Sequence, residues 1–263
     1  MDAARVAQAA RLLVEARRTG KKISELPSEC KPSNPTEANA IAAEVTRELG
    51  EPIAGWKITF LYKPREKPFI AALIKSRVLT SPADIPQSLT PSLCIEPEVT
   101  FRLLDDLPPR LKPYRPQEVA DAIEACASLE VVDTRFDTST RTIRQMLNER
   151  HSLIEAYADH ITNGAFIIGA AKKDWQELDF AKMPVTMRSE KRVIVETTGG
   201  HAFVDPFLPV VVLANEMRNS DGLKKGQVVA TGSFSGFFPV EVDELITANF
   251  PGVGQASARF VKG

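Results

Sequence analysis

The chain has 263 residues, of which 43% are hydrophobic and 25% are charged, which is typical of a globular protein. Its 33 basic and 34 acidic residues nearly cancel, so the sequence lacks the basic stripe expected of a nucleic-acid-binding protein. No apolar run is long enough to span a bilayer, and the N-terminus lacks the apolar core of a signal peptide. We therefore expect a cytoplasmic protein without nucleic-acid or membrane partners. Cys30, Cys94 and Cys126 form no CxxC pair and indicate neither a disulfide framework nor a thiolate metal site.

The first part of the chain predicts two helices. Residues 2–19 are rich in Ala, Leu and Arg and end at Gly20, a favourable C-cap. The sequence Asn-Pro-Thr-Glu at 34–37 supplies an N-cap, a proline at the first helical position and an acid in the first turn, so a second helix is expected up to Gly50. We expect a helical N-terminal lobe over residues 1–50.

The character of the chain changes after residue 50, where strand patterns dominate. Residues 105–116 form a proline-rich loop, and no internal repeat or low-complexity tract is present. Strands are expected over 53–62, 93–103, 129–136, 164–170, 192–197, 228–234, 244–250 and 256–262, and helices over 116–127, 139–158 and 205–218. The pattern predicts an α+β fold, with a β-rich body over 51–263 that forms one structural unit with the helical lobe.

Two carboxylates stand two residues apart in the strand expected over 93–103. Because residues i and i+2 of a strand point the same way, Glu96 and Glu98 share a face. Glu130 is a third carboxylate in an otherwise apolar strand. Three carboxylates with open positions suit Mg²⁺ or Mn²⁺, whereas zinc prefers His and Cys, and the three histidines have no paired spacing. The alternative is that Glu96 and Glu98 line a solvated face and pair with lysines.

Lys57 lies between Trp56 and Ile58 in an apolar strand pattern. Such a lysine either extends its ammonium group to the surface or is held against an anion. If it faces a metal site, it can donate to an enolate or a carboxylate, or transfer a proton when burial lowers its pKa.

A glycine-containing segment, Thr-Gly-Ser-Phe-Ser-Gly at 231–236, follows a short apolar strand. It either lets backbone N–H groups approach an anionic ligand or forms an ordinary turn. The chain contains no phosphate loop, no GxGxxG and no GxSxG followed by a plausible triad.

Taken together, these segments resemble a known family. The chain from about residue 35 to its C-terminus is similar to the 2-keto-4-pentenoate hydratases, which belong with the 4-oxalocrotonate decarboxylases in the fumarylacetoacetate hydrolase superfamily. The most specific part is the E-x-E pair of IEPEVTFRL, followed by the lone glutamate of LEVVDTRF. The other segments that carry the resemblance are GWKI (55–58), DLPPR…PY (106–114), YADHITNGAFIIG (157–169), LANEM (213–217), LKKGQVVATGSFSG (223–236) and ITANFPGVGQASARFV (246–261).

The resemblance implies a fold and a set of site residues. The fold is a mixed, barrel-like β-roll with flanking helices, usually oligomeric. Glu96, Glu98 and Glu130 would hold Mg²⁺ or Mn²⁺, which acts as a Lewis acid that stabilises an enolate, and Lys57 would shuttle protons. Thr162 stands where a small hydroxyl residue is typical, and together with Thr231, Gly232 and Ser233 it completes the expected substrate-binding set.

The reaction implied is the addition of water to a 2-hydroxy-2,4-dienoate or 2-oxo-4-enoate, giving a 4-hydroxy-2-oxo acid in aromatic or related catabolism. The alternatives are decarboxylation of a 2-oxo-3-enedioate, hydrolysis of an acylpyruvate-like C–C bond, and a non-catalytic scaffold role. The substrate would be a small 2-oxo or 2-hydroxydienoic acid. The protein would form a homo-oligomer, with a complex with a partner hydratase or decarboxylase as a further option.

The sequence departs from the family pattern in two places. After GWKI it is bulkier and basic, and Lys63, Arg65 and Lys67 either face a second carboxylate or lie in a solvated loop. After Phe136 it inserts about 15 residues with helical periodicity. On this insert, His151 and Glu155 form an i, i+4 pair that would either activate water or be an ordinary exposed pair. His160 replaces the usual asparagine of the motif that follows.

Overall fold

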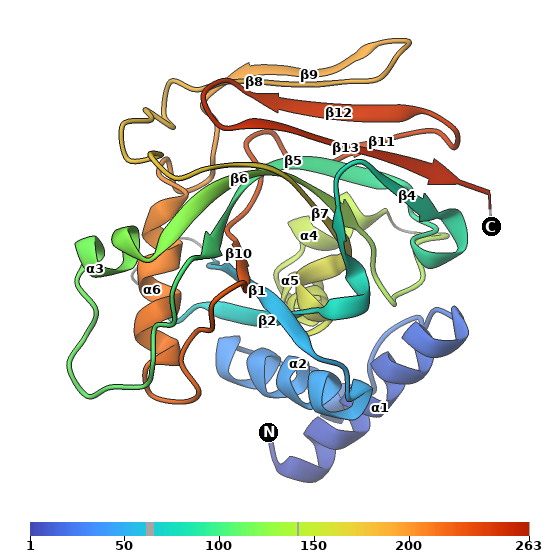
Figure 1. Cartoon of the computed structure of the whole chain (residues 1–263). Coiled ribbons are helices and arrows are strands. Elements are labelled where there is room, and N and C mark those ends of the chain that lie inside the picture. Colours follow the sequence, from blue (N-terminus) through green and yellow to red (C-terminus); the bar gives the residue numbers. More distant parts are fainter. Residues whose placement is uncertain (62–65, 141, 263) are drawn as a thin grey trace.

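The computed structural model describes residues 1–61, 66–140 and 142–262. Tyr62, which ends one expected strand, and Lys63 and Arg65 lie outside the described residues, as does Arg141 in the insert. Figure 1 shows two stacked sheets, with two N-terminal helices below the larger, curved sheet and further helices at its sides.

The two N-terminal helices confirm the expectation from their capping residues. The first, α1 (Ala3–Thr19), begins at Asp2, whose side chain accepts from the Arg5 amide, and ends at Gly20. The second, α2 (Pro35–Leu49), has Asn34 as its N-cap and ends at Gly50. Both C-cap glycines have φ near +70°, a conformation that costs other residues energy. Local chemistry therefore determines both ends of each helix.

The larger sheet carries the candidate site. Its strands in spatial order are β2 (Phe69–Ile74), β1 (Ile53–Thr59), β10 (Val228–Ala230), β5 (Cys94–Leu103), β6 (Ile123–Val132), β7 (Asn163–Lys172) and β3 (Val78–Thr80), with β11 (Phe238–Pro239) beside β5. The β1–β10 and β3–β7 pairs are parallel and the others are antiparallel. Every residue of β6 is buried, because both faces of the sheet centre are covered.

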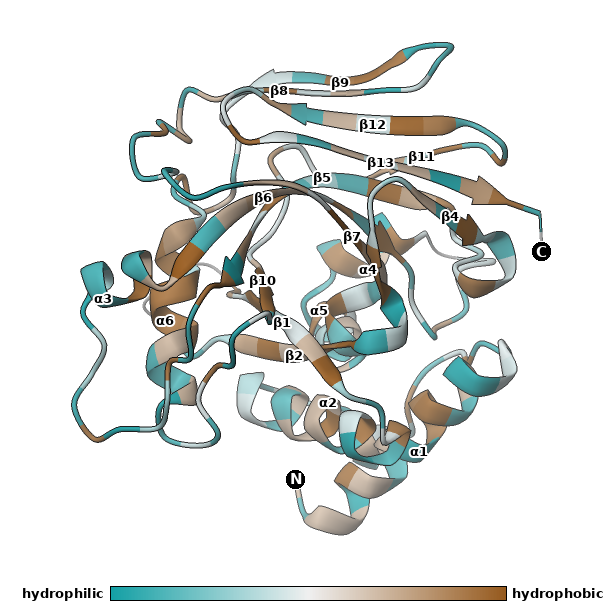
Figure 2. Cartoon of the chain, viewed as in Figure 1, coloured by the Kyte–Doolittle hydropathy of each residue, from teal (hydrophilic) through white to brown (hydrophobic). Residues whose placement is uncertain are grey.

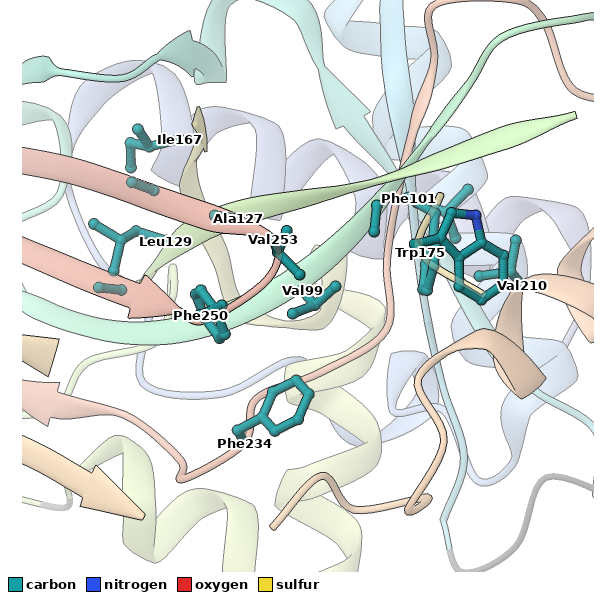
Figure 3. Close-up of a cluster of buried hydrophobic side chains, with 14 of the residues drawn as sticks. Val99, Phe101, Ala127, Leu129, Ile167, Trp175, Val210, Phe234, Phe250 and Val253 are labelled. Atoms are coloured by element: carbon teal, nitrogen blue, oxygen red, sulfur yellow. The ribbon is translucent and has the colours of Figure 1, made fainter. Parts of the chain in front are cut away.

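The smaller sheet covers one face of the larger one. Its strands in spatial order are β4 (Ala83–Pro86), β13 (Gly254–Val261), β12 (Leu245–Phe250), β8 (Pro184–Arg188) and β9 (Val193–Thr198). The main core fills the space between the sheets, with Val99, Leu129, Ile167 and Phe250 among its members (Figure 3). A Cβ atom at Gly169 would lie 2.1 Å from the Gln255 carbonyl oxygen, so only glycine allows the sheets to approach this closely.

The remaining helices are short and flank the larger sheet. They are α3 (Pro116–Asp121), α4 (Ile143–Asn148), α5 (Arg150–Ala158) and α6 (Phe207–Met217), with 3₁₀ turns η1 (Ser28–Cys30), η2 (Lys75–Arg77), η3 (Gln87–Leu89) and η4 (His160–Thr162). The colouring of Figure 2 shows apolar residues concentrated on the central strands, with hydrophilic residues on the outer loops.

Several boundary predictions were wrong. The helix expected over 116–127 stops at Asp121, because residues 123–127 pair with β5 and β7 as the start of β6. Pairing on both sides outweighs the helix propensity of Glu and Ala there. The helix expected over 139–158 is two short helices, and the strand expected over 228–234 ends at Ala230. The sequence does not predict the strands β2, β3, β4, β8 and β11.

The α+β fold with a mixed β-roll body and N-terminal helices is confirmed. The division at residue 50 stays a prediction, although Leu13 and Ile41 of the helices share one apolar cluster with Phe69, Met146 and Ile154 of the body. In the described part of the chain, no helix combines the length and apolarity needed to cross a membrane.

Candidate functional site

Strand pairing brings the three glutamates together. Strands β5 and β6 are antiparallel, with Glu96 directly opposite Glu130 and Glu98 opposite Ser128. One carboxylate oxygen from each glutamate lies within 4.8 Å of one from each of the others. Like charges directly opposite each other destabilise a sheet, so this arrangement calls for a compensating cation.

The burial of these carboxylates makes that need stronger. Glu98 and Glu130 are fully buried, and Glu96 is half-buried. Within the described residues, neither Glu98 oxygen has a hydrogen-bond partner. A buried carboxylate without partners is costly, and a set of carboxylate oxygens is the one that Mg²⁺ and Mn²⁺ prefer. The residues present therefore fit a divalent cation of this kind.

Lys57 lies against the carboxylate cluster. It is 6% exposed, which excludes the alternative of an ammonium group at the surface. Its Nζ donates to both oxygens of Glu130, with 2.5 Å to Oε2, and to the Ile161 carbonyl oxygen at 3.0 Å. Strand β1 positions it, since Lys57 stands opposite Ala230 of β10, the strand next to β5.

The charges shift the acidities of these groups. Burial, with the charge of Glu130, raises the pKa of Glu96 to about 8 and that of Glu98 well above its usual range, against the opposing effect of Lys57. Burial alone would lower the pKa of Lys57, but Glu130, Glu98 and Glu96 raise it above its ordinary value. Without a bound cation, the lysine is charged and the glutamates compete for protons.

A strained turn presents the carbonyl group that binds Lys57. His160, Ile161 and Thr162 have φ of 49°, 52° and 56° in succession, a left-handed conformation that is unfavourable for non-glycine residues. The Thr162 amide donates to the Asp159 carbonyl oxygen at 3.0 Å, and the Thr162 hydroxyl to the Ile161 carbonyl oxygen at 2.7 Å. Thr162 therefore lies beside the lysine, bonded to the same carbonyl oxygen.

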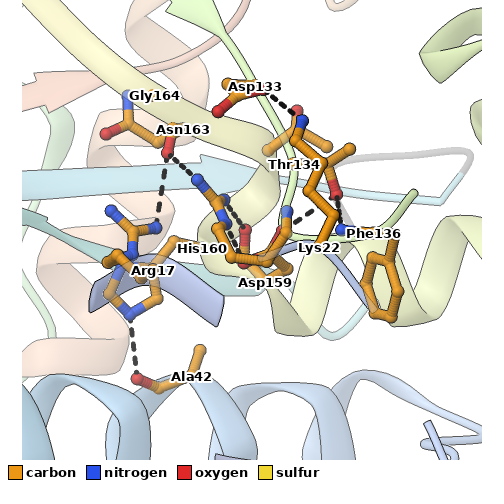
Figure 4. A network of polar contacts seen from close by, with 12 residues as sticks. Arg17, Lys22, Ala42, Asp133, Thr134, Phe136, Asp159, His160, Asn163 and Gly164 are labelled. Carbon is orange, nitrogen blue, oxygen red and sulfur yellow. Dashed lines mark hydrogen bonds and ion pairs between the residues drawn. The ribbon is translucent and has the colours of Figure 1, made fainter. Parts of the chain in front are cut away.

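Two polar residues near this turn have distinct places (Figure 4). The Asn163 amide donates to Glu130 Oε1 at 3.0 Å, a contact that the sequence analysis missed because only strand pairing reveals it. Nε2 of His160 instead lies 3.2 Å from both the Ala42 carbonyl oxygen and the Thr46 hydroxyl, on α2. Burial, with the charge of Arg17, lowers the pKa of His160 well below its usual value.

A buried ion pair between Arg135 and Asp159 lies beside Asn163, whose backbone carbonyl oxygen also accepts from Arg135. Nε of Arg135 donates to Asp159 Oδ1 at 2.6 Å, and the Thr134 hydroxyl donates to Oδ2 at 2.9 Å. Because Asp159 directly precedes the strained turn, this pair holds the turn in place.

The segment at 231–236 lies beside Glu98. Glu98 and Ser233 form an isolated β-bridge, and the Ser233 hydroxyl donates to the Pro97 carbonyl oxygen at 3.2 Å. The Thr231 hydroxyl is buried and has no hydrogen-bond partner within the described residues. Gly232 has φ +112°. The structure thus brings Thr231, Gly232 and Ser233 to the site, while their contact with a substrate stays a prediction.

His201 is a site residue that the sequence analysis missed. It is 4% exposed, and its Nε2 has no hydrogen-bond partner among the described residues. A Cβ atom at Gly232 would lie 3.8 Å from that nitrogen. Burial lowers the pKa of His201 to about 4, so the ring is neutral. Its only sequence signal is a histidine after two glycines, which is too weak to assign a role.

The inserted helix α5 brings Tyr157 close to the carboxylate cluster, a residue that the sequence analysis did not single out. His151 is exposed and Glu155 is buried, and their role in water activation stays a prediction. From the same helix, Tyr157 lies close enough to Lys57 and Glu96 for their charges to act on its hydroxyl, and burial raises the pKa of that hydroxyl. All three cysteines are free thiols, as expected.

No family model matches the chain. The curated relatives include the 4-oxalocrotonate decarboxylases of Pseudomonas putida and of Pseudomonas sp. strain CF600, which are 25% and 26% identical to this chain over 135 residues. Each match covers 51% of this chain and 47% of the relative. The chain thus spans about half the length of the curated relatives it matches.

Solved structures with the same fold extend over more of the chain. The 4-oxalocrotonate decarboxylase from Pseudomonas putida G7, complexed with magnesium and adipate, has a TM-score of 0.80 at 21% identity and covers 99% of this chain and 98% of that one. A fumarylpyruvate hydrolase from Pseudomonas aeruginosa, in complex with Mn²⁺ and pyruvate, has a TM-score of 0.53 at 15% identity, with 79% and 89% coverage. The chain therefore shares its fold with the first of these structures over nearly its whole length.

Proposed function

We propose that this chain, as a member of the 4-oxalocrotonate decarboxylase and 2-keto-4-pentenoate hydratase family, is a divalent-metal-dependent enzyme that decarboxylates a small 2-oxo-3-enedioate. The observation that carries the proposal is the buried cluster of Glu96, Glu98 and Glu130 with Lys57 against it. The curated relatives and the solved structure with a TM-score of 0.80 support decarboxylation ahead of hydration, the reaction that the sequence alone favours.

The three glutamates would hold Mg²⁺ or Mn²⁺. Their burial, their spacing and the two unpartnered oxygens of Glu98 support this assignment, as do the magnesium and Mn²⁺ named in the two solved structures. When bound, the ion supplies Lewis-acid chemistry to the 2-oxo acid group of the substrate.

Lys57 would handle the charge that develops on the substrate. In decarboxylation, the C5–C6 bond breaks, CO₂ leaves, and the electron pair moves through the C3–C4 double bond to the 2-oxygen. The charged ammonium group, fixed by Glu130 and the Ile161 carbonyl oxygen, would donate a proton to that oxygen. The product is a 2-hydroxy-2,4-dienoate.

Hydration of that dienoate is the second candidate function. It is favoured by two uncharged polar atoms near Glu98, the Thr231 hydroxyl oxygen and Nε2 of His201, which have no hydrogen-bond partner within the described residues. Such groups can hold a water molecule for addition at C4. A homo-oligomer, and a complex with a partner hydratase, also remain proposals that rest on the resemblance.

Proton NMR of the purified protein tests the proposal. With 2-oxo-3-hexenedioate and Mg²⁺, we expect 2-hydroxypenta-2,4-dienoate to form, and the rate to be lost without the ion or in Glu96→Gln. Glu124→Gln is the matched control, because Glu124 lies on β6 but pairs with Arg102, and this variant should keep the activity.

A second tube containing 2-hydroxypenta-2,4-dienoate separates the candidates. Formation of 4-hydroxy-2-oxopentanoate there, with no reaction of the dioate, would replace the decarboxylase assignment with the hydratase one. No turnover of either compound would favour the scaffold role. Cleavage of an acylpyruvate that is lost in His151→Ala would favour the hydrolase.

A further inference from the structure

A cavity of about 600 Å³ lies apart from the carboxylate cluster. It is formed by the end of α1, by η2, by the loop around residues 86–91 and by the segment that follows β6. Its lining includes five basic side chains and one acidic one, and we call it the arginine pocket. These residues are Arg17, Arg18, Lys22, Arg77, Arg135 and Asp133.

The acidic groups near the arginine pocket are already paired. Asp133 accepts from Lys22 Nζ at 2.9 Å and also from Ser92, and Asp159 behind it pairs with Arg135. Within the described part of the chain, neither Arg17 nor Arg77 lies within salt-bridge distance of a carboxylate. Neither guanidinium group therefore has an ion-pair partner among the described residues, although the charge of Asp133 acts on both.

Three guanidinium groups converge on one short piece of backbone. Arg17 Nη2 and Arg135 Nη1 lie 3.4 and 3.1 Å from the Asn163 carbonyl oxygen (Figure 4). Arg77 Nη1 lies 3.5 Å from the next carbonyl oxygen, that of Gly164, and 3.0 Å from that of Leu89. Neutral carbonyl groups occupy few of the donors that these side chains carry.

The like charges repel one another. Burial, with the charge of Arg135, lowers the pKa of Arg17 to about 9, and the same two causes lower the pKa of Arg77. A cluster of guanidinium groups with spare donors is the arrangement that recognises carboxylate and phosphate oxygens. A bound anion would remove the repulsion and satisfy those donors.

We propose that the arginine pocket is a binding site for a small divalent oxyanion, either a phosphate or a dicarboxylate. The site does not depend on the metal or on the proposed reaction, because no glutamate of the carboxylate cluster lines it. Asn163 lies between the two sites. Its backbone carbonyl oxygen accepts from Arg135, and its side-chain amide donates to Glu130.

Thermal unfolding of the metal-free protein tests the proposal. Inorganic phosphate should raise the midpoint over sodium chloride of equal ionic strength, by about 3 °C at roughly ten times Kd. Arg17→Gln and Arg77→Gln should each lose this increment.

Arg11→Gln is the matched control, because Arg11 is exposed on the same helix and does not line the pocket. It should keep the full increment. Succinate in place of phosphate separates the two ligand chemistries, since an increment with one anion alone identifies that class. The proposal would be overturned if neither anion raised the unfolding midpoint above that in sodium chloride of equal ionic strength. It would also be overturned if the rise persisted in both Arg17→Gln and Arg77→Gln. If Arg17→Gln fails to fold, Arg77→Gln decides alone.

Discussion

Glu98 is the residue whose surroundings explain the candidate site best. Its two oxygens are buried without hydrogen-bond partners in the described residues, beside two other carboxylates and one ammonium group. One positive charge cannot balance three negative ones, so the metal-free site must hold protons that a cation would displace. The sequence predicts that Glu96 and Glu98 share a face, since the strand period requires it. That Glu130 stands opposite Glu96 depends on strand pairing, which residue spacing alone does not specify.

Stability should therefore depend on pH and on Mg²⁺ together. Because the pKa of Glu96 is raised to about 8 in the folded chain, the folded state holds a proton that the unfolded state releases above its ordinary carboxyl pKa. The free energy of unfolding of the metal-free protein should fall as pH rises from about 5 to beyond 8. Thermal melts at pH 6 and pH 8.5 should show that Mg²⁺ stabilises more at the higher pH. An equal Mg²⁺ increment at both pH values would contradict this account.

Among the helices and strands, those whose ends depend on nearby residues were predicted well, whereas those that depend on pairing between distant segments were not. The caps of α1 and α2 lie in the local sequence, and both helices were predicted within about one residue. The sequence predicts a helix at the start of β6, because Glu124 and Ala125 favour helices when sheet neighbours are ignored. The local sequence does not predict the left-handed run in η4, since Ile161 and Thr162 are β-branched residues that rarely adopt φ above zero. Burial and the nearby ion pair impose it.

Strand β1 positions Lys57 through a close approach at Gly55. A Cβ atom there would lie 2.2 Å from the Val228 carbonyl oxygen of β10. Gly55→Ala should lower the free energy of unfolding by about 1–3 kcal/mol and weaken Mg²⁺ binding, because β1 and its lysine must shift. Urea unfolding and calorimetric titration measure the two effects. Gly50→Ala is the control: with no atom within 4 Å and φ +67°, it should cost about 1 kcal/mol and leave Mg²⁺ affinity unchanged. Equal Mg²⁺ affinity in Gly55→Ala would refute the positional role.

At the scale of the whole molecule, two apolar clusters hold the fold together. One fills the space between the sheets, and the other joins the N-terminal helices to β2, α4 and α5. The sequence predicts a helical lobe and a β-rich body, but it does not show that the helices cover the same turn that presents the Ile161 carbonyl group. His160 makes that connection through its contacts with α2.

The helical lobe and the body should consequently unfold together. Leu13→Ala removes a side chain that is 1% exposed in the second cluster, and should cost about 2–5 kcal/mol. Far-ultraviolet circular dichroism follows the helices, and the fluorescence of Trp56 and Trp175 follows the body. Both midpoints should shift equally in urea, whereas exposed Glu15→Ala should shift neither by more than a few tenths of a kcal/mol. A shift seen only by circular dichroism would mean that residues 1–50 form a separate unit.

The most direct test of the carboxylate cluster is a Mn²⁺ titration followed by electron paramagnetic resonance, with wild type, Glu98→Gln and Glu124→Gln compared. We expect one tightly bound Mn²⁺ per chain in wild type and in Glu124→Gln. In Glu98→Gln we expect the affinity to fall by about 100-fold, which corresponds to roughly 2.8 kcal/mol. Equal Mn²⁺ binding in Glu98→Gln and wild type, or no saturable binding in any of the three, would contradict the assignment of these glutamates as metal ligands.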